Sequence, residues 1–370
     1  MSDSIFDRLF ELFQSPGPVN WKLAAEVRKS LVGAAEPIDP HLAEEYAELA
    51  RAAELRLGAA THLDVGFGGS VQPVDRTGWA EANGHSFGYA IAPLAGKLLG
   101  ATDESNPMAA MLAPMGPAVL GMQAGTMVGF MAHRVLGQFD AGLPPLDQDE
   151  LFLVVPNTES FAVDHSLDPR QVRMWAAAHE VLHHAIVSIP WVRAHIIGVV
   201  DAFYASVRFD PSKLTEALSS IEDPAALEGM LGGAGGLASL FGAEHDGSLL
   251  GPVQATLAAI AGYGDYAIRR GLTDVLSDID RLEEAAARRR AEPDQAEQFL
   301  QQLVGLELDR HRANDAVAFF AEIERRWGVE AVERVWMDAA SLPTEVELTD
   351  PVGWAARVLL EDAADDEFGE

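Results

Sequence analysis

The segment His179-Glu180-Val181-Leu182-His183 has the pattern HExxH, whose residue types and spacing can bind a metal ion and activate water. Residues four apart lie on one face of an α-helix, so His179 and His183 can direct their imidazoles at a single tetrahedral Zn²⁺. Glu180 would then stand beside a metal-bound water and act as the general base. The pattern therefore predicts a hydrolytic zinc site with two metal ligands, His179 and His183, and one catalytic residue, Glu180.

The residues around this motif predict a helix with a defined start and end. Asp168 can cap the helix, Pro169 suits its first turn, and Pro190 stops it. The continuous apolar run 151–156 precedes the helix and predicts a buried strand. One helix is expected to follow Pro190 at once, and another to start at Gly251.

The remaining sequence mostly has helical periodicity, so we expect a mainly α fold with few short strands. Helices are expected in 5–13, from Asn20, after Asp39, and in 78–100, 277–290, 295–304, 315–336 and 354–360, whereas 58–77 is expected to be irregular. We expect a single domain over 1–370, with a helical N-terminal region spanning 1–150, an HExxH-containing region spanning 151–275, a helical C-terminal region spanning 276–361 and an acidic tail at 362–370.

The composition limits the chemistry and the partners. The chain has 26 basic and 57 acidic residues and a formal net charge of −31, which argues against binding to nucleic acid or to an anionic membrane surface. It has no cysteine, so any metal must be bound by His, Asp or Glu. The first residues lack the basic start and the cleavage site of a secretion signal, so we expect a cytoplasmic protein.

The apolar run 108–132 is long enough to span a membrane but predicts a core helix instead. Gly121, Gly125 and Gly129 recur every four residues and form a flat face that lets another helix approach closely. Pro114 and Pro117 also interrupt the first third of the run. We therefore expect no membrane contact.

Short motifs distributed over nearly the whole chain resemble those of one family. They are Gly17-Pro18-Val19-Asn20-Trp21, Leu136-Gly137-Gln138-Phe139-Asp140, Val154-Val155-Pro156-Asn157, the segment 175–183, Pro190-Trp191-Val192-Arg193, and Leu342-Pro343-Thr344 with Asp350-Pro351 and Trp354. Together they resemble the type 2 zincin-like metallopeptidases of actinobacteria and their relatives, often labelled hydrolases. The resemblance implies a mostly helical zincin-like fold, with His179 and His183 as zinc ligands and Glu180 as general base.

One segment departs from that family pattern. The resemblance implies a Leu-Glu-Gly-His-x-Asp segment, with the glutamate as third zinc ligand and the aspartate orienting a ligand histidine. This chain has Ile260-Ala261-Gly262-Tyr263-Gly264-Asp265, so a methyl group replaces the carboxylate at Ala261 while Asp265 is kept. A catalytic zinc normally has three protein ligands, so Zn²⁺ is expected to be weakly bound or absent unless another group substitutes.

Several residues could substitute for the missing ligand. Asp265 is the favoured candidate, either as the third ligand or behind a ligand histidine; Glu244 or His245 could come from the glycine-rich segment 228–247. His184 is the poorest, because adjacent helical residues point about 100° apart. In addition, Tyr263 or Tyr266 could stabilise an oxyanion, although buried tyrosines commonly only pack.

Two functions therefore stay open at the level of sequence. One is a zinc-dependent, metallopeptidase-type hydrolase acting on a peptide or another amide, which the intact HExxH pattern favours. The alternative is a degenerate zincin-fold pseudoenzyme that serves as a binding or assembly module, which Ala261 favours.

Overall fold

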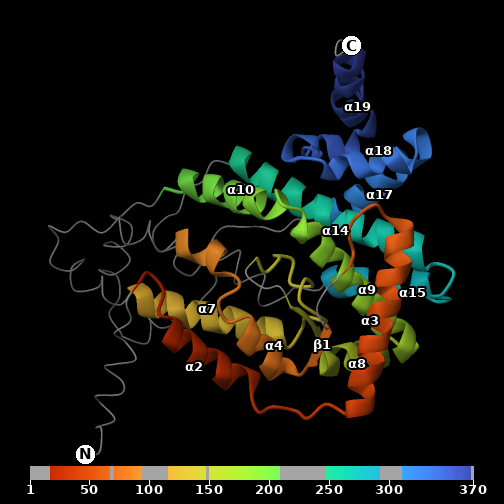
Figure 1. Ribbon diagram of the computed structural model, residues 1–370. Coiled ribbons are helices and arrows are strands. Elements are labelled where there is room, and N and C mark those ends of the chain that lie inside the picture. The colour runs from red at the N-terminus through yellow and green to blue at the C-terminus, as the bar shows by residue number, and fades with distance from the viewer. Residues whose placement is uncertain are drawn as a thin grey trace, which may run out of the picture.

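The protein is mainly helical, as expected, in a computed structural model that describes residues 17–66, 71–93, 116–146, 150–208, 247–291 and 311–367 (Figure 1). The expected helices 5–13 and 295–304, and the candidates Glu244 and His245, lie outside these ranges. The described helices are α2 (Trp21–Val32), α3 (Pro40–Ala60), α4 (Arg76–Ala82), α7 (Gly116–Ala132), α8 (Val155–Asp164), α9 (Pro169–Ser188), α10 (Val192–Ser206), α14 (Leu250–Leu272), α15 (Ile279–Ala291), α17 (His311–Trp327), α18 (Val329–Glu333) and α19 (Pro351–Glu367).

A small parallel sheet lies beside the HExxH helix. Strand β1 (Val71–Val74) pairs with β2 (Leu151–Val154), with Val71 opposite Leu151. The expectation that 58–77 is irregular was wrong at β1, whose side chains are only partly buried and include Pro73, so the strand has no clear local pattern. Strand β2 is buried throughout, but it ends before the expected run does, because Val155 begins α8.

Helix α9 has the predicted ends. The carboxylate of Asp168 accepts a hydrogen bond from the backbone N of Gln171 at 3.0 Å, and Pro169 occupies the first turn. The helix stops at Ser188, two residues before Pro190. Most of its side chains are buried, because α3, α8, α10, α14 and β2 all pack against it. This surrounding shell places the HExxH motif inside the protein.

The glycines of α7 admit α2 at very short range, as expected (Figure 1). A Cβ atom at Gly121 would lie 2.9 Å from the carbonyl carbon of Asn20, and one at Gly125 would lie 2.9 Å from the Cα of Ala24. Such distances leave no room for a side chain, so these positions require glycine. The side-chain oxygen of Asn20 accepts from the backbone N of Leu23 at 3.0 Å and caps α2 as predicted.

The C-terminal half differs from expectation at its helix ends. Helix α14 begins at Leu250, one residue before the expected start, ends at Leu272, and packs between α9 and α17. The expected helix 315–336 is divided at Gly328, whose φ of 87° is left-handed and separates α17 from α18. The expected C-terminal helix was 354–360 with an acidic tail from 362, but α19 continues into that tail as far as Glu367.

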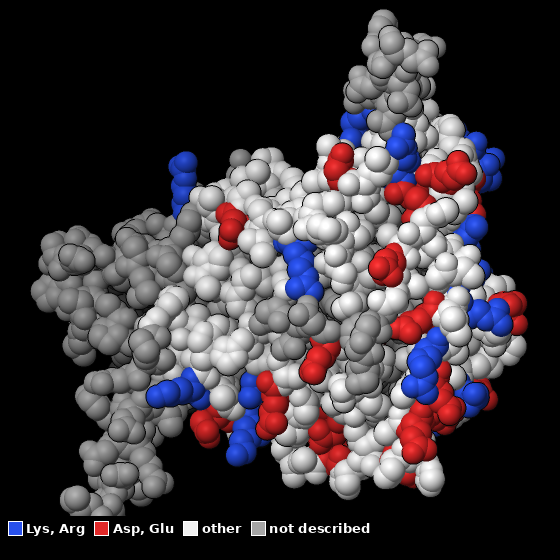
Figure 2. Space-filling view, viewed as in Figure 1, with Lys and Arg blue, Asp and Glu red and all other residues white. Residues whose placement is uncertain are grey.

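No single described helix is long and apolar enough to cross a membrane; α9 and α10 meet the length and composition criteria only together, as a pair bent by 80°. On the face shown in Figure 2, acidic and basic side chains lie side by side. Several charged side chains of the described residues form ion pairs, as Arg170 does with Glu45 and Arg269 does with Glu283. Exposed pairs of this kind contribute little to stability.

Candidate active site

The two histidines of the motif lie together on one side of α9. Their ring centroids are 4.0 Å apart and the planes are inclined by 28°. Nδ1 of His183 is 2.8 Å from the carbonyl oxygen of His179. A hydrogen bond at Nδ1 fixes the ring and leaves Nε2 as the nitrogen for a ligand, as is usual for metal-bound histidines.

The carboxyl group of Glu180 is fully enclosed, with 2% of the residue exposed. The backbone N of Phe139 donates to its Oε2 at 2.7 Å, and Nδ1 of His179 lies 3.2 Å from its Oε1. A Cβ atom at Gly137 would lie 2.6 Å from Oε1, so only glycine permits this close approach. Glu180 is therefore held between its own helix and the segment Gly137–Phe139.

That segment is held in place by β2 and by a buried amide pair. The backbone N of Val154 donates to the carbonyl of Leu136 at 2.8 Å, and Gly137 forms an antiparallel bridge with Leu153. Gln138 and Asn83 exchange two side-chain hydrogen bonds of 2.9 and 2.8 Å. The motif 136–140 contributed to the family resemblance, but sequence reasoning gave it no role; here it forms the wall beside the general-base candidate.

Burial shifts the ionisation of all three motif residues. Burial raises the pKa of Glu180 to about 8, although the hydrogen bond from the backbone N of Phe139 lowers it. Burial, helped by the neighbouring His179, lowers the pKa of His183 to about 3. It also lowers the pKa of His179, and the nearby charge of Asp140 opposes that change. Without a metal, both histidines are neutral at pH 7, which is the form that binds a metal.

Helix α14 covers the other side of the histidines. A Cβ atom at Gly264 would lie 2.9 Å from Nε2 of His183, so the α14 backbone is in direct contact with the imidazole. Ala261 and Asp265 lie one turn apart on α14, and Ala261 stands three residues before Gly264, so these positions share the face turned to α9. The position where the family resemblance implies a ligand glutamate therefore lies one turn before the glycine that contacts His183, and it carries a methyl group.

Two adjacent arginines of α15 bind the two aspartates near the motif. Nη2 of Arg290 lies 2.8 Å from Oδ2 of Asp265, and Nη2 of Arg289 lies 2.6 Å from Oδ1 of Asp140. Nη1 of Arg289 also donates to the carbonyl of Arg134 at 2.8 Å. The local sequence around these arginines does not identify partners so distant along the chain.

The other sequence candidates point elsewhere. The hydroxyl of Tyr263 donates to Glu333 of α18 at 3.0 Å, and the rings of Tyr263 and Tyr266 pack on Phe320 of α17. Both tyrosines thus belong to the core in this arrangement. His184 lies edge-on to Phe139, with ring centroids 6.4 Å apart.

The fit to a zinc ion is incomplete. Across the described ranges, no three His, Asp or Glu side chains lie close enough to hold one metal ion. His179 and His183 offer two nitrogen ligands, whereas the carboxylate of Asp265 is bound by Arg290. The described side chains do not form the three-ligand set of a catalytic zinc site.

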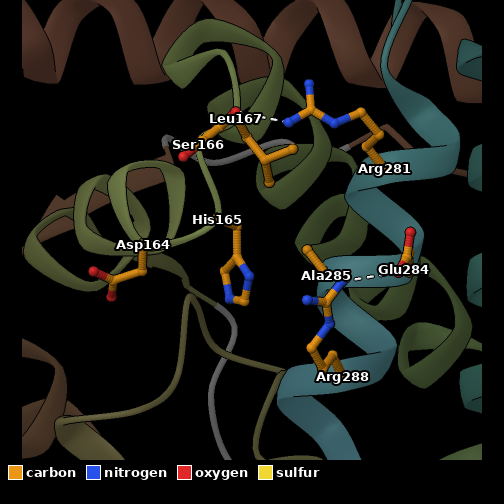
Figure 3. A pocket seen from close by; sticks show the side chains of 8 residues that line it. All are labelled: Asp164, His165, Ser166, Leu167, Arg281, Glu284, Ala285 and Arg288. Carbon is orange, nitrogen blue, oxygen red and sulfur yellow. Dashed lines mark hydrogen bonds and ion pairs between the residues drawn. The ribbon is translucent and has the colours of Figure 1, made fainter.

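A pocket of about 210 Å³ lies between α15 and the turn that joins α8 to α9, away from the motif (Figure 3). The arginines of its lining have partners within the pocket: Arg288 binds the carboxylate of Glu284, and Arg281 donates to the backbone carbonyl of Ser166. The imidazole of His165 lies at its centre (Figure 3). None of the HExxH side chains lines this pocket.

A family model described as zincin-like metallopeptidase matches residues 19–355. The chain belongs to this family. It also resembles the crystal structure of a putative hydrolase with a novel fold from Chloroflexus aurantiacus, with a TM-score of 0.64 and 21% sequence identity over 92% of this chain and 98% of that chain. At that identity the likeness shows a shared fold. No curated protein matches the chain. The zincin-like family match thus agrees with the resemblance seen in the sequence motifs.

Proposed function

We propose that this zincin-like protein is a zinc-dependent hydrolase that cleaves a peptide or another amide, with Glu180 as the general base. The observation that carries the proposal is the convergence of His179, Glu180 and His183 on one side of a buried helix, in a chain of the zincin-like family. The description of the Chloroflexus protein as a hydrolase is consistent with it.

The surroundings of Glu180 suit a group that exchanges a proton near neutral pH. Its pKa of about 8, caused by burial, lies close to the pH at which a general base and acid works best. The N–H of Phe139 fixes the carboxyl group through Oε2, while Oε1 faces His179. A zinc ion held by His179 and His183 would supply Lewis-acid activation of water and of the substrate carbonyl. Asp265 is the carboxylate proposed to join them, and its present partner is Arg290.

The test combines metal analysis with a conservative variant. The purified full chain, loaded with Zn²⁺, is assayed on a panel of peptide and amide substrates beside Glu180→Gln, which keeps the shape of the side chain but cannot accept the proton. Hydrolysis is expected to fall by roughly 10²-fold or more in the variant. Glu330→Gln changes the same charge at an exposed site and serves as the matched control. Equal activity in Glu180→Gln and the wild type would refute the role of Glu180.

A second candidate, the degenerate scaffold, is favoured by one specific arrangement. Ala261 cannot bind a metal, and the carboxylate of Asp265 is bound by a guanidinium. In that case the HExxH residues would hold α9 against the segment 137–139 and α14, and the protein would bind a partner without hydrolysis. A folded protein that takes up no zinc and cleaves no substrate of the panel would support this second function over the first.

A further inference from the structure

Asp265 is a carboxylate on the turn of α14 that contacts the second histidine of the motif. It follows directly after Gly264, whose backbone touches the ring of His183. Asp265 is thus a near neighbour of the site without belonging to a cluster of three potential ligands among the described residues.

The partner of Asp265 is a permanent cation. Arg290 donates from Nη2 to Oδ2 of Asp265 at 2.8 Å, and 13% of the Asp265 side chain is exposed. A guanidinium stays protonated at every pH at which the protein is folded, and it binds carboxylates through strong charge-assisted hydrogen bonds. A carboxylate that neutralises a guanidinium in this way is a poorer ligand for a second cation.

The end of α15 places this charge firmly. Arg289, the preceding residue, binds Asp140, and its guanidinium lies over the ring of Phe161, 5.6 Å from the centroid. Asp140 in turn accepts from the backbone N of Leu136 at 2.8 Å. The segment that encloses Glu180 and the C-terminal turn of α15 are thus joined, which anchors the turn that carries Arg290 next to Asp265.

We propose that Arg290 is an internal competitor for the metal: it occupies the carboxylate of Asp265 and thereby sets the affinity of the His179–His183 pair for Zn²⁺. The inference rests on the proposed function only in taking these histidines as ligands. The guanidinium of Arg290 takes the place beside Asp265 that Zn²⁺ would otherwise occupy, which explains why the ligand set is incomplete. Release of Asp265 from Arg290 would provide the third ligand that Ala261 does not.

The experiment measures zinc affinity of the full-length chain by competition with a fluorescent chelator, with no assay of activity. Arg290→Met removes the charge and keeps most of the volume, and it is expected to raise the affinity by roughly 10- to 100-fold, the range in which groups behind the ligands act. Arg288→Met is the matched control, because it makes the same substitution on the same helix at an exposed arginine whose partner is Glu284. The control is expected to leave the affinity unchanged.

Two further variants make the outcome specific. Arg290→Met combined with Asp265→Asn should lose the gain, since the amide is a weaker ligand than the carboxylate. Arg290→Lys keeps the positive charge but not the planar guanidinium, so a smaller gain in zinc affinity is expected. If Arg290→Met does not fold, Arg290→Lys takes its place in the test. Absorption of bound Co²⁺ in the visible range should change in Arg290→Met as an oxygen ligand joins.

The results separate the inference from the proposed function. Zinc affinity that depends on His179 but is the same in the wild type, Arg290→Met and Arg290→Lys would overturn the inference and leave the proposed function standing. Absence of zinc binding in all of these proteins would overturn both.

Discussion

The backbone of Gly137 lies directly against the carboxyl group of Glu180, so close that a Cβ atom there would be 2.6 Å from Oε1. Gly137 belongs to an antiparallel bridge with Leu153, so it cannot retreat without disturbing β2. A single glycine hydrogen atom thus allows the general-base candidate to sit beside the N–H of Phe139.

Gly137→Ala is expected to displace Glu180 and to break its hydrogen bond with Phe139. The added methyl group overfills a buried site, which costs about 1–3 kcal/mol of unfolding free energy, and hydrolysis should fall by roughly 10²-fold. Chemical denaturation and the substrate panel measure the two effects. Gly198→Ala is the control, because nothing lies within 4 Å of the added atom and alanine favours a helix. Wild-type stability in Gly137→Ala would contradict the close approach.

Gly264→Ala tests the contact between α14 and the second histidine. The new Cβ atom would lie 2.9 Å from Nε2 of His183 and would push the imidazole or the helix aside. We expect a loss of about 1–3 kcal/mol in stability together with weaker zinc binding. Thermal unfolding and the chelator competition assay measure them. Wild-type stability and zinc binding in the variant would contradict the direct contact between α14 and His183 of α9.

The local signals in the sequence predict the elements better than the contacts between them. The ends of α9 were predictable because Asp168, Pro169 and Pro190 act within one turn of the helix ends. The close packing of α2 on α7 was predictable because glycines four residues apart form a helix face without side chains, which a second helix can approach closely. Strand β1 was missed because its pairing with β2 depends on a partner distant in the chain.

The same distinction applies to the candidate site. The HExxH pattern placed His179, Glu180 and His183 correctly on one helix, since all three lie within a single short motif. The N–H that binds Glu180 comes from Phe139, 41 residues earlier in the chain, and Arg290 reaches Asp265 from 25 residues beyond it. Nothing in the local composition of either segment indicates these partners. The charges that decide whether a metal binds therefore become visible only in the folded chain.

The ionisation of Glu180 predicts how the stability of the metal-free protein depends on pH. A glutamate in the unfolded chain has a pKa of about 4.3, and burial raises that of Glu180 to about 8. The folded form therefore binds the extra proton between these values, and the contribution of Glu180 to stability, complete below about pH 4, is lost as the pH rises to about 8. Glu180→Gln cannot ionise, so the stability of the variant relative to the wild type should increase over this range, by up to about 1.4 kcal/mol per pH unit.

Denaturation of both proteins at several pH values in the presence of a chelator measures this difference. Glu330→Gln, at an exposed position, should show no comparable trend. A difference between Glu180→Gln and the wild type that stays constant from about pH 4 to about pH 8 would mean that water reaches the carboxyl group in solution.

Ala261→Glu tests the vacant ligand position directly. Ala261 is half-buried, and it lies three residues before the glycine that touches His183, so a carboxylate placed there faces the two histidines. It would reach the metal without separating Asp265 from Arg290, and zinc affinity is expected to rise by at least about tenfold. Ala261→Gln has nearly the same size without the charge and should give little or no gain. An unchanged affinity in Ala261→Glu, with His179 still required for binding, would show that another group already fills the third ligand position.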